Sequence, residues 1–507
     1  MTSHAPPVLR NGQAIELAAL EPVPFDHFRE HLVGSIRQGA RLAALFGQPL
    51  HGNGLRLHAL LADGQQATVS WCSAEVDGSY PSLTPECPQA HWFEREIAEQ
   101  WAVRPEGHPW LKPLRYHRAY RSGSDAWGRP ADVTPEPAVT DFFRVEGEEV
   151  HEVAVGPVHA GVIEPGHFRF QCHGERVFHL EIALGFQHRG VERALPGGPN
   201  RRTVYYMETL AGDTTIGHTL AYCQAVEALA GCRVPARAQA LRAIALELER
   251  LANHTGDLGA LAGDIGFLPV ASYCGRLRGD FLNLTALLCG SRFGRGLVRP
   301  GGVGFDAEAG RLARLQEGLE RAMVDVTAAV DMLWNTPSVE ARFENAGAVS
   351  RQACLDLGLV GVAARACGVE RDVRHEFPLG LYQFAQIPVS TCPNGNVFAR
   401  AYVRWLEIQR SAAFIREQLR SVPGGAVHRD AGTLRPGLAV VSLAEGWRGE
   451  ICHVALTGGD GHFTCYRIVD PSFHNWMGLA MAMRDQQISD FPLCNKSFNL
   501  SYCGHDL

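Results

Sequence analysis

Three long runs of apolar residues recur at α-helical spacing, and they constrain the fold more than any other feature of the chain. They occupy residues 241–251, 312–333 and 398–419, and charged residues fall on the remaining faces. Because positions three and four apart share one face of a helix, each run predicts a helix with one apolar side. Such helices pack against one another, so the pattern predicts a helical bundle around a common core.

The length of the chain indicates more than one domain. At 507 residues it exceeds what a single hydrophobic core normally organises. Residues 122–140 are rich in Gly, Ser, Asp and Pro, which is typical of a linker. We therefore expect a small domain at residues 1–121 and a larger one at residues 141–507.

The small domain shows both helical and strand patterns. Residues 25–45 carry apolar side chains at helical spacing and predict a helix. Residues 55–61 and 67–72 read as strands, and a second helix is expected to begin at His91. These elements predict an α/β unit.

The larger domain opens with strand signals before its helices begin. Residues 153–159, 166–173 and 177–182 alternate or cluster like strands, with a turn at Pro165. The chain is therefore expected to have an α+β fold. A small N-terminal α/β domain precedes a large, mostly helical domain with an N-terminal β-hairpin region.

Composition excludes several classes of protein. The net charge is −7 and no long block of Lys or Arg is present, so a nucleic-acid partner is not expected. No apolar run reaches the ~18 residues of a membrane helix, and any membrane role must come through partners. The 14 cysteines form no Cys-x-x-Cys pair, which argues against an iron–sulfur cluster held by this chain alone. No Gly-x-Gly-x-x-Gly opens a strand–helix unit, so any NADH oxidation would belong to another subunit.

Eight short segments of the larger domain follow one another in a characteristic order, at residues 156–159, 164–168, 185–192, 220–227, 291–303, 365–374, 448–450 and 466–473. In that order they resemble the large subunit shared by membrane-bound (group 4) nickel–iron hydrogenases and complex I, where it is the 49-kilodalton or D subunit. The resemblance implies that residues 141–507 form a domain like a hydrogenase large subunit.

The first domain carries a resemblance of its own. Glu94-Arg95-Glu96, followed by Gly107-His108-Pro109, is similar to the signature of the 30-kilodalton, or C, subunit of complex I. The two subunits are fused in hydrogenase-4 and formate hydrogenlyase complexes, as the two domains are here. The ending at residues 501–507 favours that branch over complex I proper.

The family's first nickel-binding motif, Cys-Gly-x-Cys-x-x-x-His, aligns with residues 211–218. Ala211 and Thr214 stand at the two cysteine positions, whereas His218 is retained. The first thiolate pair of a nickel site is therefore missing from this alignment.

The second motif, Asp-Pro-Cys-x-x-Cys-x-x-His, aligns with the end of the chain. Asn499 and Tyr502 stand at its cysteine positions, and His505 is retained. Thiolate is the soft ligand that such a metal needs. The loss of all four thiolates argues against a nickel–iron centre.

The quinone ligands of complex I are also replaced. The tyrosine that reaches the quinone headgroup aligns with Gly212, and the histidine aligns with Pro165. The resemblance therefore implies a redox subunit whose site is remodelled relative to both branches of the family.

Two charged candidates remain around the predicted cavity. Glu164 aligns with a carboxylate that carries protons in hydrogenases, and the alternative is a glutamate that fixes the turn at Pro165. Arg448 aligns with an arginine above the hydrogenase metal and could hold an anion or an electron-rich headgroup. The alternative for Arg448 is a buried ion pair with Glu450 or Asp213.

Three further residues complete the candidate catalytic set. His218 and His505 align with motif histidines, and histidine suits proton-coupled sites because it titrates near neutral pH. The alternative for each is a hydrogen-bonded core histidine. Asp264 aligns with an acidic position near the complex I cavity, where it could couple redox chemistry to proton motion. The alternative is a loop aspartate that caps a helix.

The remaining candidates line the former metal pocket and are predicted to contact a bound cofactor or acceptor. Asp213 with His218 gives only two ligands without a thiolate, so no metal site is predicted. The predicted cofactor-binding residues are Gly212, Asp213, Thr214, Asn499 and Tyr502.

Three functional hypotheses follow. The favoured one is the large subunit of a complex I-related NADH–quinone oxidoreductase or hydrogenase-like complex. It would take electrons from an iron–sulfur partner subunit, pass them to a quinone or another acceptor, and couple this to proton or ion movement. It would dock on antiporter-like membrane subunits at the cytoplasmic side of the bacterial inner membrane, as a peripheral subunit.

The second hypothesis is a non-catalytic scaffold, and the third, disfavoured by the missing thiolates, is an active hydrogenase. A charged, wet cavity lined by Glu164, His218, Arg448 and His505 would favour chemistry over a scaffold.

Overall fold

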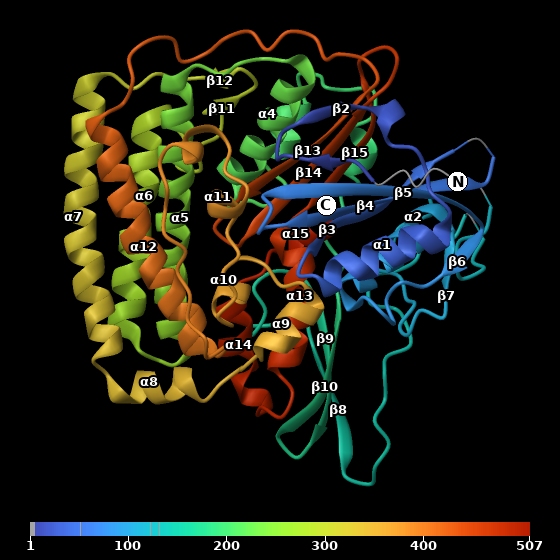
Figure 1. Ribbon diagram of the computed structural model, residues 1–507. Helices are drawn as coiled ribbons and strands as arrows, with labels where there is room; N and C mark the ends of the chain where they lie inside the picture. The colour runs from blue at the N-terminus through green and yellow to red at the C-terminus, as the bar shows by residue number, and fades with distance from the viewer. Residues whose placement is uncertain (1–5, 51, 122, 131) are drawn as a thin grey trace.

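The computed structural model describes residues 6–50, 52–121, 123–130 and 132–507. It is an α+β protein, with a helical bundle on one side and two β-sheets with their helices on the other (Figure 1). The three apolar runs fall in helices of the bundle, which confirms that prediction. The bundle helices are α5 (Ala236–Asp264), α6 (Leu268–Cys289), α7 (Ala309–Trp334) and α12 (Val397–Arg420).

Helix α6 was not predicted, although its sequence carries the signal. It packs between α5 and α7 and buries residues at alternating spacings of four and three. The residues on this stripe are Val270, Cys274, Leu277, Phe281, Leu284 and Leu288.

The N-terminal domain holds a six-stranded sheet in which β3 (Arg41–Pro49), β4 (Gly54–Asp63) and β5 (Thr68–Asp77) are antiparallel neighbours. Helices α1 (Phe25–Arg37) and α2 (His91–Trp101) pack on it. The predicted helix over residues 25–45 is therefore wrong beyond Arg37. A strand buried on both faces shows an unbroken apolar run, which resembles a buried helix in sequence.

A second sheet has the order β15-β14-β13-β2. Its strands β13 (Leu438–Glu445), β14 (Glu450–Thr457) and β15 (Phe463–Val469) come from near the C-terminus and were not predicted. Strand β2 (Ala14–Glu16) comes from the N-terminal segment and pairs with β13. The two ends of the sequence are thus joined in one sheet.

The predicted hairpin region is present as the antiparallel strands β8 (Val150–Val155), β9 (His167–His173) and β10 (Arg176–Ala183). It extends from the body of the molecule at the lower edge of Figure 1. Between Glu106 and Val150 the described residues form no helix or strand, and the predicted linker lies inside this stretch. The exact domain boundaries stay a prediction.

The chain ends inside the molecule. After β15, helices α13 (Pro471–Ala482), α14 (Phe491–Phe498) and α15 (Tyr502–Asp506) carry it back toward α4 (Thr215–Ala230). Leu507 is buried, and its carbonyl accepts hydrogen bonds from the backbone of Arg189 and Gly190. None of the described helices combines the length and apolar character that a bilayer span requires.

Candidate functional site

The two motif segments lie together, as the sequence predicts. Arg448, which follows β13, spans them: its two terminal nitrogens donate to the Asp213 carboxylate at 2.6 and 2.8 Å, and its Nε donates to the carbonyl of Asn499 at 2.5 Å. One buried side chain therefore joins the loop before α4 to the loop between α14 and α15.

A second arginine makes the same connection. Arg189 donates through Nη2 to the carbonyls of Leu210 and Cys503, at 2.8 and 3.1 Å. The backbone of Gly212 also hydrogen-bonds the Cys503 thiol. The site is thus formed by residues 210–214 and 499–503, and the hairpin loop lies against it.

Arg448 is neutralised within the site. Its side chain is 3% exposed and stacks on the Trp447 ring at 3.9 Å. Burial opposes the charged form, but the Asp213 carboxylate outweighs burial and raises the pKa of Arg448. Burial likewise opposes charge on Asp213, yet Arg448 holds the pKa of Asp213 below its usual value. The ion-pair alternative is the one observed, with Asp213 as partner, whereas Glu450 pairs with Arg41.

Thr214 and Asn499, at two of the aligned cysteine positions, already have partners. The Thr214 hydroxyl donates to Asp213 at 3.1 Å and accepts from Arg448 at 3.2 Å. The Asn499 side chain donates to the carboxylate of Asp257 at 2.5 Å. Thr214 therefore contacts both members of the ion pair, and Asn499 links the same loop to α5.

Ala211 and Tyr502, at the other two aligned cysteine positions, are also buried and in contact with neighbouring residues. Ala211 is fully buried and its carbonyl accepts from the backbone of Thr214. Tyr502 is also buried; its hydroxyl bonds to Asn495 at 3.2 Å, and its ring lies where a side chain at Gly166 would clash. The tyrosine ring thus fills space beside the hairpin loop.

The donor set does not fit a thiolate-bound nickel. Among the described residues, no group of three or more His, Cys, Asp or Glu side chains is arranged to hold a metal. Cys503 is a thiol beside the aligned positions, and burial raises its pKa, which disfavours the thiolate. A nickel–thiolate centre requires several such ligands at once.

Glu164 reaches the site from the loop between β8 and β9. Its carboxylate accepts a hydrogen bond from the backbone of Cys503 at 3.2 Å. Burial raises the pKa of Glu164, and the charge of Arg448 opposes this shift. A carboxyl with a raised pKa beside the ion pair suits proton transfer. The contact with Cys503 fixes the turn as well, so both interpretations of Glu164 stay open.

His218 belongs to a buried hydrogen-bonded chain. Its Nε2 bonds to Asp470 at 2.9 Å and its Nδ1 bonds to Nε2 of His453 at 3.2 Å. His453 bonds in turn to the Tyr466 hydroxyl at 2.9 Å. Burial, reinforced by repulsion from His218, lowers the pKa of His453 well below its usual value and keeps it neutral. Three of these four residues were missed, because nothing in the sequence spacing links β14, β15 and α13 to α4.

His505 lies at the junction with the N-terminal domain. Its imidazole bonds to Asp506 at 3.1 Å and packs against Trp92 of α2 and Phe473 of α13. Its carbonyl accepts from Arg115 at 2.8 Å. Burial lowers the pKa of His505. These contacts are those of the core-histidine alternative.

Asp264 is the last residue of α5 and is exposed. The residue of α5 that reaches the site is Asp257, which binds Asn499 and Arg404. Seven residues along a helix correspond to about 10 Å. Asp257, two turns before Asp264, is therefore an acidic residue of α5 that contacts the site, and the role assigned to Asp264 stays a prediction.

Glu249 is a further residue that sequence reasoning missed. Its side chain extends from α5 to the first turn of α4, where it is buried and accepts hydrogen bonds from the backbone of Ile216 and Gly217 at 2.7 and 3.1 Å. Burial raises the pKa of Glu249 to about 8. Together with Asp213, Asn253 and Arg292 it lines a small cavity of about 10 Å³. A second carboxyl with a raised pKa thus lies next to the site.

Two known protein families match separate parts of the chain. The family described as respiratory-chain NADH dehydrogenase, 49 Kd subunit, matches residues 264–437, and the 30 Kd subunit family matches residues 52–124. Both motif segments of the site lie outside these matched ranges.

Individual relatives cover more of the chain. It is 29% identical to formate hydrogenlyase subunit 5 of Escherichia coli K12, over 92% of this chain and 84% of the relative. It is 28% identical to hydrogenase-4 component G of the same organism, over 91% and 83%. NADH-quinone oxidoreductase subunit 4 of Thermus thermophilus is 28% identical, over 71% and 94%. The chain is thus similar to the 30 Kd and 49 Kd subunits of respiratory-chain NADH dehydrogenase in two separate ranges, and to formate hydrogenlyase subunit 5 and hydrogenase-4 component G over most of its length.

Proposed function

We propose that this chain is the large subunit of a membrane-associated, hydrogenase-4-like oxidoreductase that passes electrons from a partner iron–sulfur subunit to a quinone or another acceptor. The observation that carries the proposal is the remodelled site. The two motif segments still meet around Arg448 and Asp213, while the positions aligned with nickel thiolates bear side chains unsuited to nickel. A site that is retained without these ligands favours a different acceptor.

The protonable groups around the site support an acceptor that takes up protons with its electrons. Reduction of a quinone to a quinol consumes two electrons and two protons. Glu164 and Glu249 both have raised pKa values, and each contacts one of the segments that carry the site. A carboxyl group that is protonated near neutral pH can donate its proton to a reduced acceptor. Coupled proton or ion movement is part of the proposal.

Partner subunits would supply what this chain lacks. Its cysteines are dispersed, so the electron-donating cluster would belong to an iron–sulfur small subunit. Antiporter-like subunits would hold the complex at the cytoplasmic side of the bacterial inner membrane. NADH oxidation, where the complex uses NADH, would occur on another subunit.

A non-catalytic scaffold is the second candidate, and a specific observation favours it. Arg448 and Asp213 neutralise one another, and the Tyr502 ring fills the space beside Gly166. The residues of the predicted cavity are therefore largely paired or packed. Catalysis would require the acceptor to enter between the ion pair and the hairpin loop.

The deciding experiment purifies the intact complex and compares it with two variants. Glu164→Gln should slow turnover while the complex keeps all its subunits, because it removes a proton carrier and keeps the shape. Glu148→Gln, at an exposed position before the same hairpin, is the matched control. Unchanged turnover in Glu164→Gln would leave Glu164 only its role of fixing the turn at Pro165. Elemental analysis that finds one nickel per chain would instead identify an active hydrogenase.

A further inference from the structure

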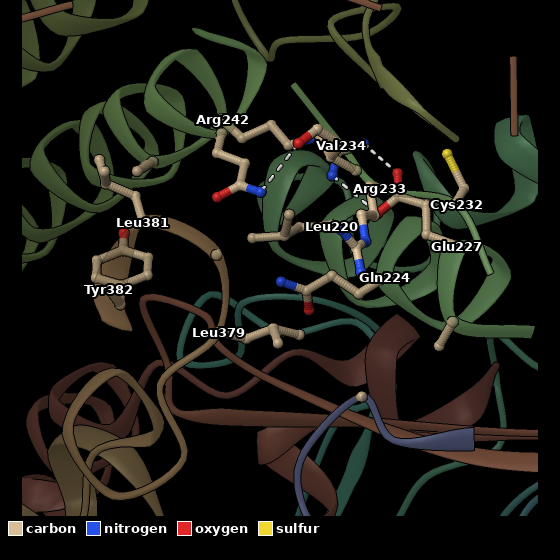
Figure 2. Close-up of a pocket in the computed structure, with 15 residues that line it drawn as sticks. Leu220, Gln224, Glu227, Cys232, Arg233, Val234, Arg242, Leu379, Leu381 and Tyr382 are labelled. Carbon is tan, nitrogen blue, oxygen red and sulfur yellow. Dashed lines mark hydrogen bonds and ion pairs between the residues drawn. The ribbon is translucent and has the colours of Figure 1, made fainter. Parts of the chain in front are cut away.

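A surface cleft of about 390 Å³ lies at the opposite end of α4 from the Arg448–Asp213 pair (Figure 2). It is bounded by α4, the first turns of α5, the turn at Gly12 and residues 379–382. None of its lining residues takes part in the site described above. Its volume falls in the range of small-molecule sites, which are about 300–1,000 Å³.

The floor of the cleft is a fixed ion pair. Arg242 and Glu227 are both buried, and Arg242 donates to the two carboxylate oxygens, at 3.1 Å in one of these bonds. The Nε of Arg242 donates to the carbonyl of Gly302, and its Nη2, which also contacts Glu227, donates to the carbonyl of Arg299. This pair contributes no net charge to the cleft.

Arg233 adds a positive charge that nothing cancels. It is exposed, it lines the cleft, and within the described part of the chain it has neither an ion-pair nor a hydrogen-bond partner. Arg435 lies behind the same wall, where it donates to the carbonyls of Ala228 and Leu229. The cleft is therefore a positively charged environment, which favours an anion.

The opposite side of the cleft is apolar and rigid. Figure 2 shows Leu379 and Tyr382 across the cleft from Arg233 and Glu227. The Tyr382 hydroxyl donates to the buried Glu247 at 2.7 Å, which holds the aromatic ring in place. A ligand that reaches Arg233 would thus lay its remaining surface against apolar side chains.

Gln224 provides a neutral donor between these two sides. Its side-chain carbonyl accepts from Ser442 at 3.2 Å, which leaves the amide nitrogen available to the cleft. An amide N–H beside a guanidinium is a common arrangement for binding carboxylate or phosphate oxygens.

We propose that this cleft binds a small amphiphilic anion, that is, a carboxylate or phosphate on a short apolar body, with Arg233 recognising the charge. The apolar body lies on Leu379 and Tyr382, and the anionic oxygens meet Arg233 and the Gln224 amide. The site is independent of the redox chemistry proposed above.

Titration of the full-length chain with four probes of equal chain length tests the proposal by calorimetry at fixed ionic strength. The probes are octanoate, octyl phosphate, 1-octanol and octylammonium. Octanoate or octyl phosphate should bind, and the neutral and cationic probes should bind at least about tenfold more weakly. The stronger of the two anions identifies whether carboxylate or phosphate is preferred.

Variants at Arg233 then test whether this residue binds the charged group of the ligand. Arg233→Gln should weaken anion binding about tenfold, whereas Arg233→Lys should retain most of it. Arg314→Gln, at an exposed arginine of α7, is the control and should bind like the unchanged protein. Failure of both anions to bind, equal binding of 1-octanol, or unchanged affinity in Arg233→Gln would each overturn the proposal.

Discussion

Arg448 and Asp213 form a two-point ion pair at 2.6 and 2.8 Å, and this pair joins segments that are 235 positions apart in the sequence. Asp213 comes from the loop before α4, and Arg448 comes from the turn between β13 and β14. Since Arg448 also binds the carbonyl of Asn499, the pair fixes three parts of the chain at one point. The geometry of the candidate site depends on it.

Removal of one partner of this pair should be more costly than removal of both. Arg448→Gln leaves Asp213 without its counter-charge and should destabilise the fold by about 3 kcal/mol. The double variant Arg448→Gln/Asp213→Asn should regain part of that loss, because no unpaired charge remains. Thermal unfolding of the two single variants and the double variant gives the coupling between the residues. Strictly additive losses would contradict the proposed role of the pair.

Glu249 should make stability depend on pH. Its pKa rises from the ordinary value of 4.5 to about 8 in the folded chain, so folding favours the protonated form. The stabilisation that it contributes is complete below about pH 4.5 and is lost as pH rises through about 8. The thermal midpoint between pH 5 and 9 should therefore fall more steeply in the unchanged protein than in Glu249→Gln.

Glu317→Gln provides the control for this titration, since Glu317 is exposed on α7. That variant should follow the unchanged protein across the whole pH range. Parallel curves for Glu249→Gln and the unchanged protein would show that Glu249 does not hold a proton in the folded state.

Helix α5 shows how far sequence patterns reach. Its apolar stripe predicts the helix and one buried face. The charged residues Glu247, Glu249 and Arg250 were assigned to the other faces, yet all three are buried. Other elements surround α5, and its charges are neutralised by distant residues, as Arg374 does for Glu247. A single sequence gives no sign of such partners.

The C-terminal sheet was missed for a related reason. Every residue of β14 is buried, so the strand shows no alternation of apolar and polar side chains. The candidate site was predictable in part, because the retained histidines and Arg448 mark where the motif segments should meet. The chain from His218 through His453 to Tyr466 was not predictable, since it depends on the register between β14 and β15.

The buried His218 depends on Asp470 for one of its hydrogen bonds, and Asp470→Asn tests that dependence. Asp470 also caps α13 by accepting from the backbone of Ser472 at 2.8 Å, and asparagine is an equally good cap. The substitution therefore removes the negative charge that faces His218, with little change to the helix. A loss of about 1–3 kcal/mol in unfolding free energy is expected.

Tyr466→Phe is the companion variant at the far end of the same chain. It removes only the hydroxyl that His453 contacts and should cost about 1 kcal/mol. Thermal unfolding checks both variants, and an Asp470→Asn protein as stable as the unchanged one would show that the His218 contact adds nothing to the fold.

Arg115 should be required to hold the C-terminus in place. It donates to the carbonyl of His505 at 2.8 Å and pairs with Glu96 of α2, so it joins the N-terminal domain to the last helix. Arg115→Met keeps the apolar stem but removes both contacts, and the loss of a buried charge partner is expected to cost about 3 kcal/mol.

Because Leu507 is buried, the unchanged chain should resist carboxypeptidase, whereas Arg115→Met should be trimmed at its C-terminus within the same digestion time. Arg118→Met, at a nearby arginine whose side chain donates to Thr134, is the control and should stay resistant. Equal resistance of Arg115→Met would mean that the other contacts of α15 and Leu507, such as the packing on Trp92 and the hydrogen bonds from Arg189, hold the C-terminus without Arg115.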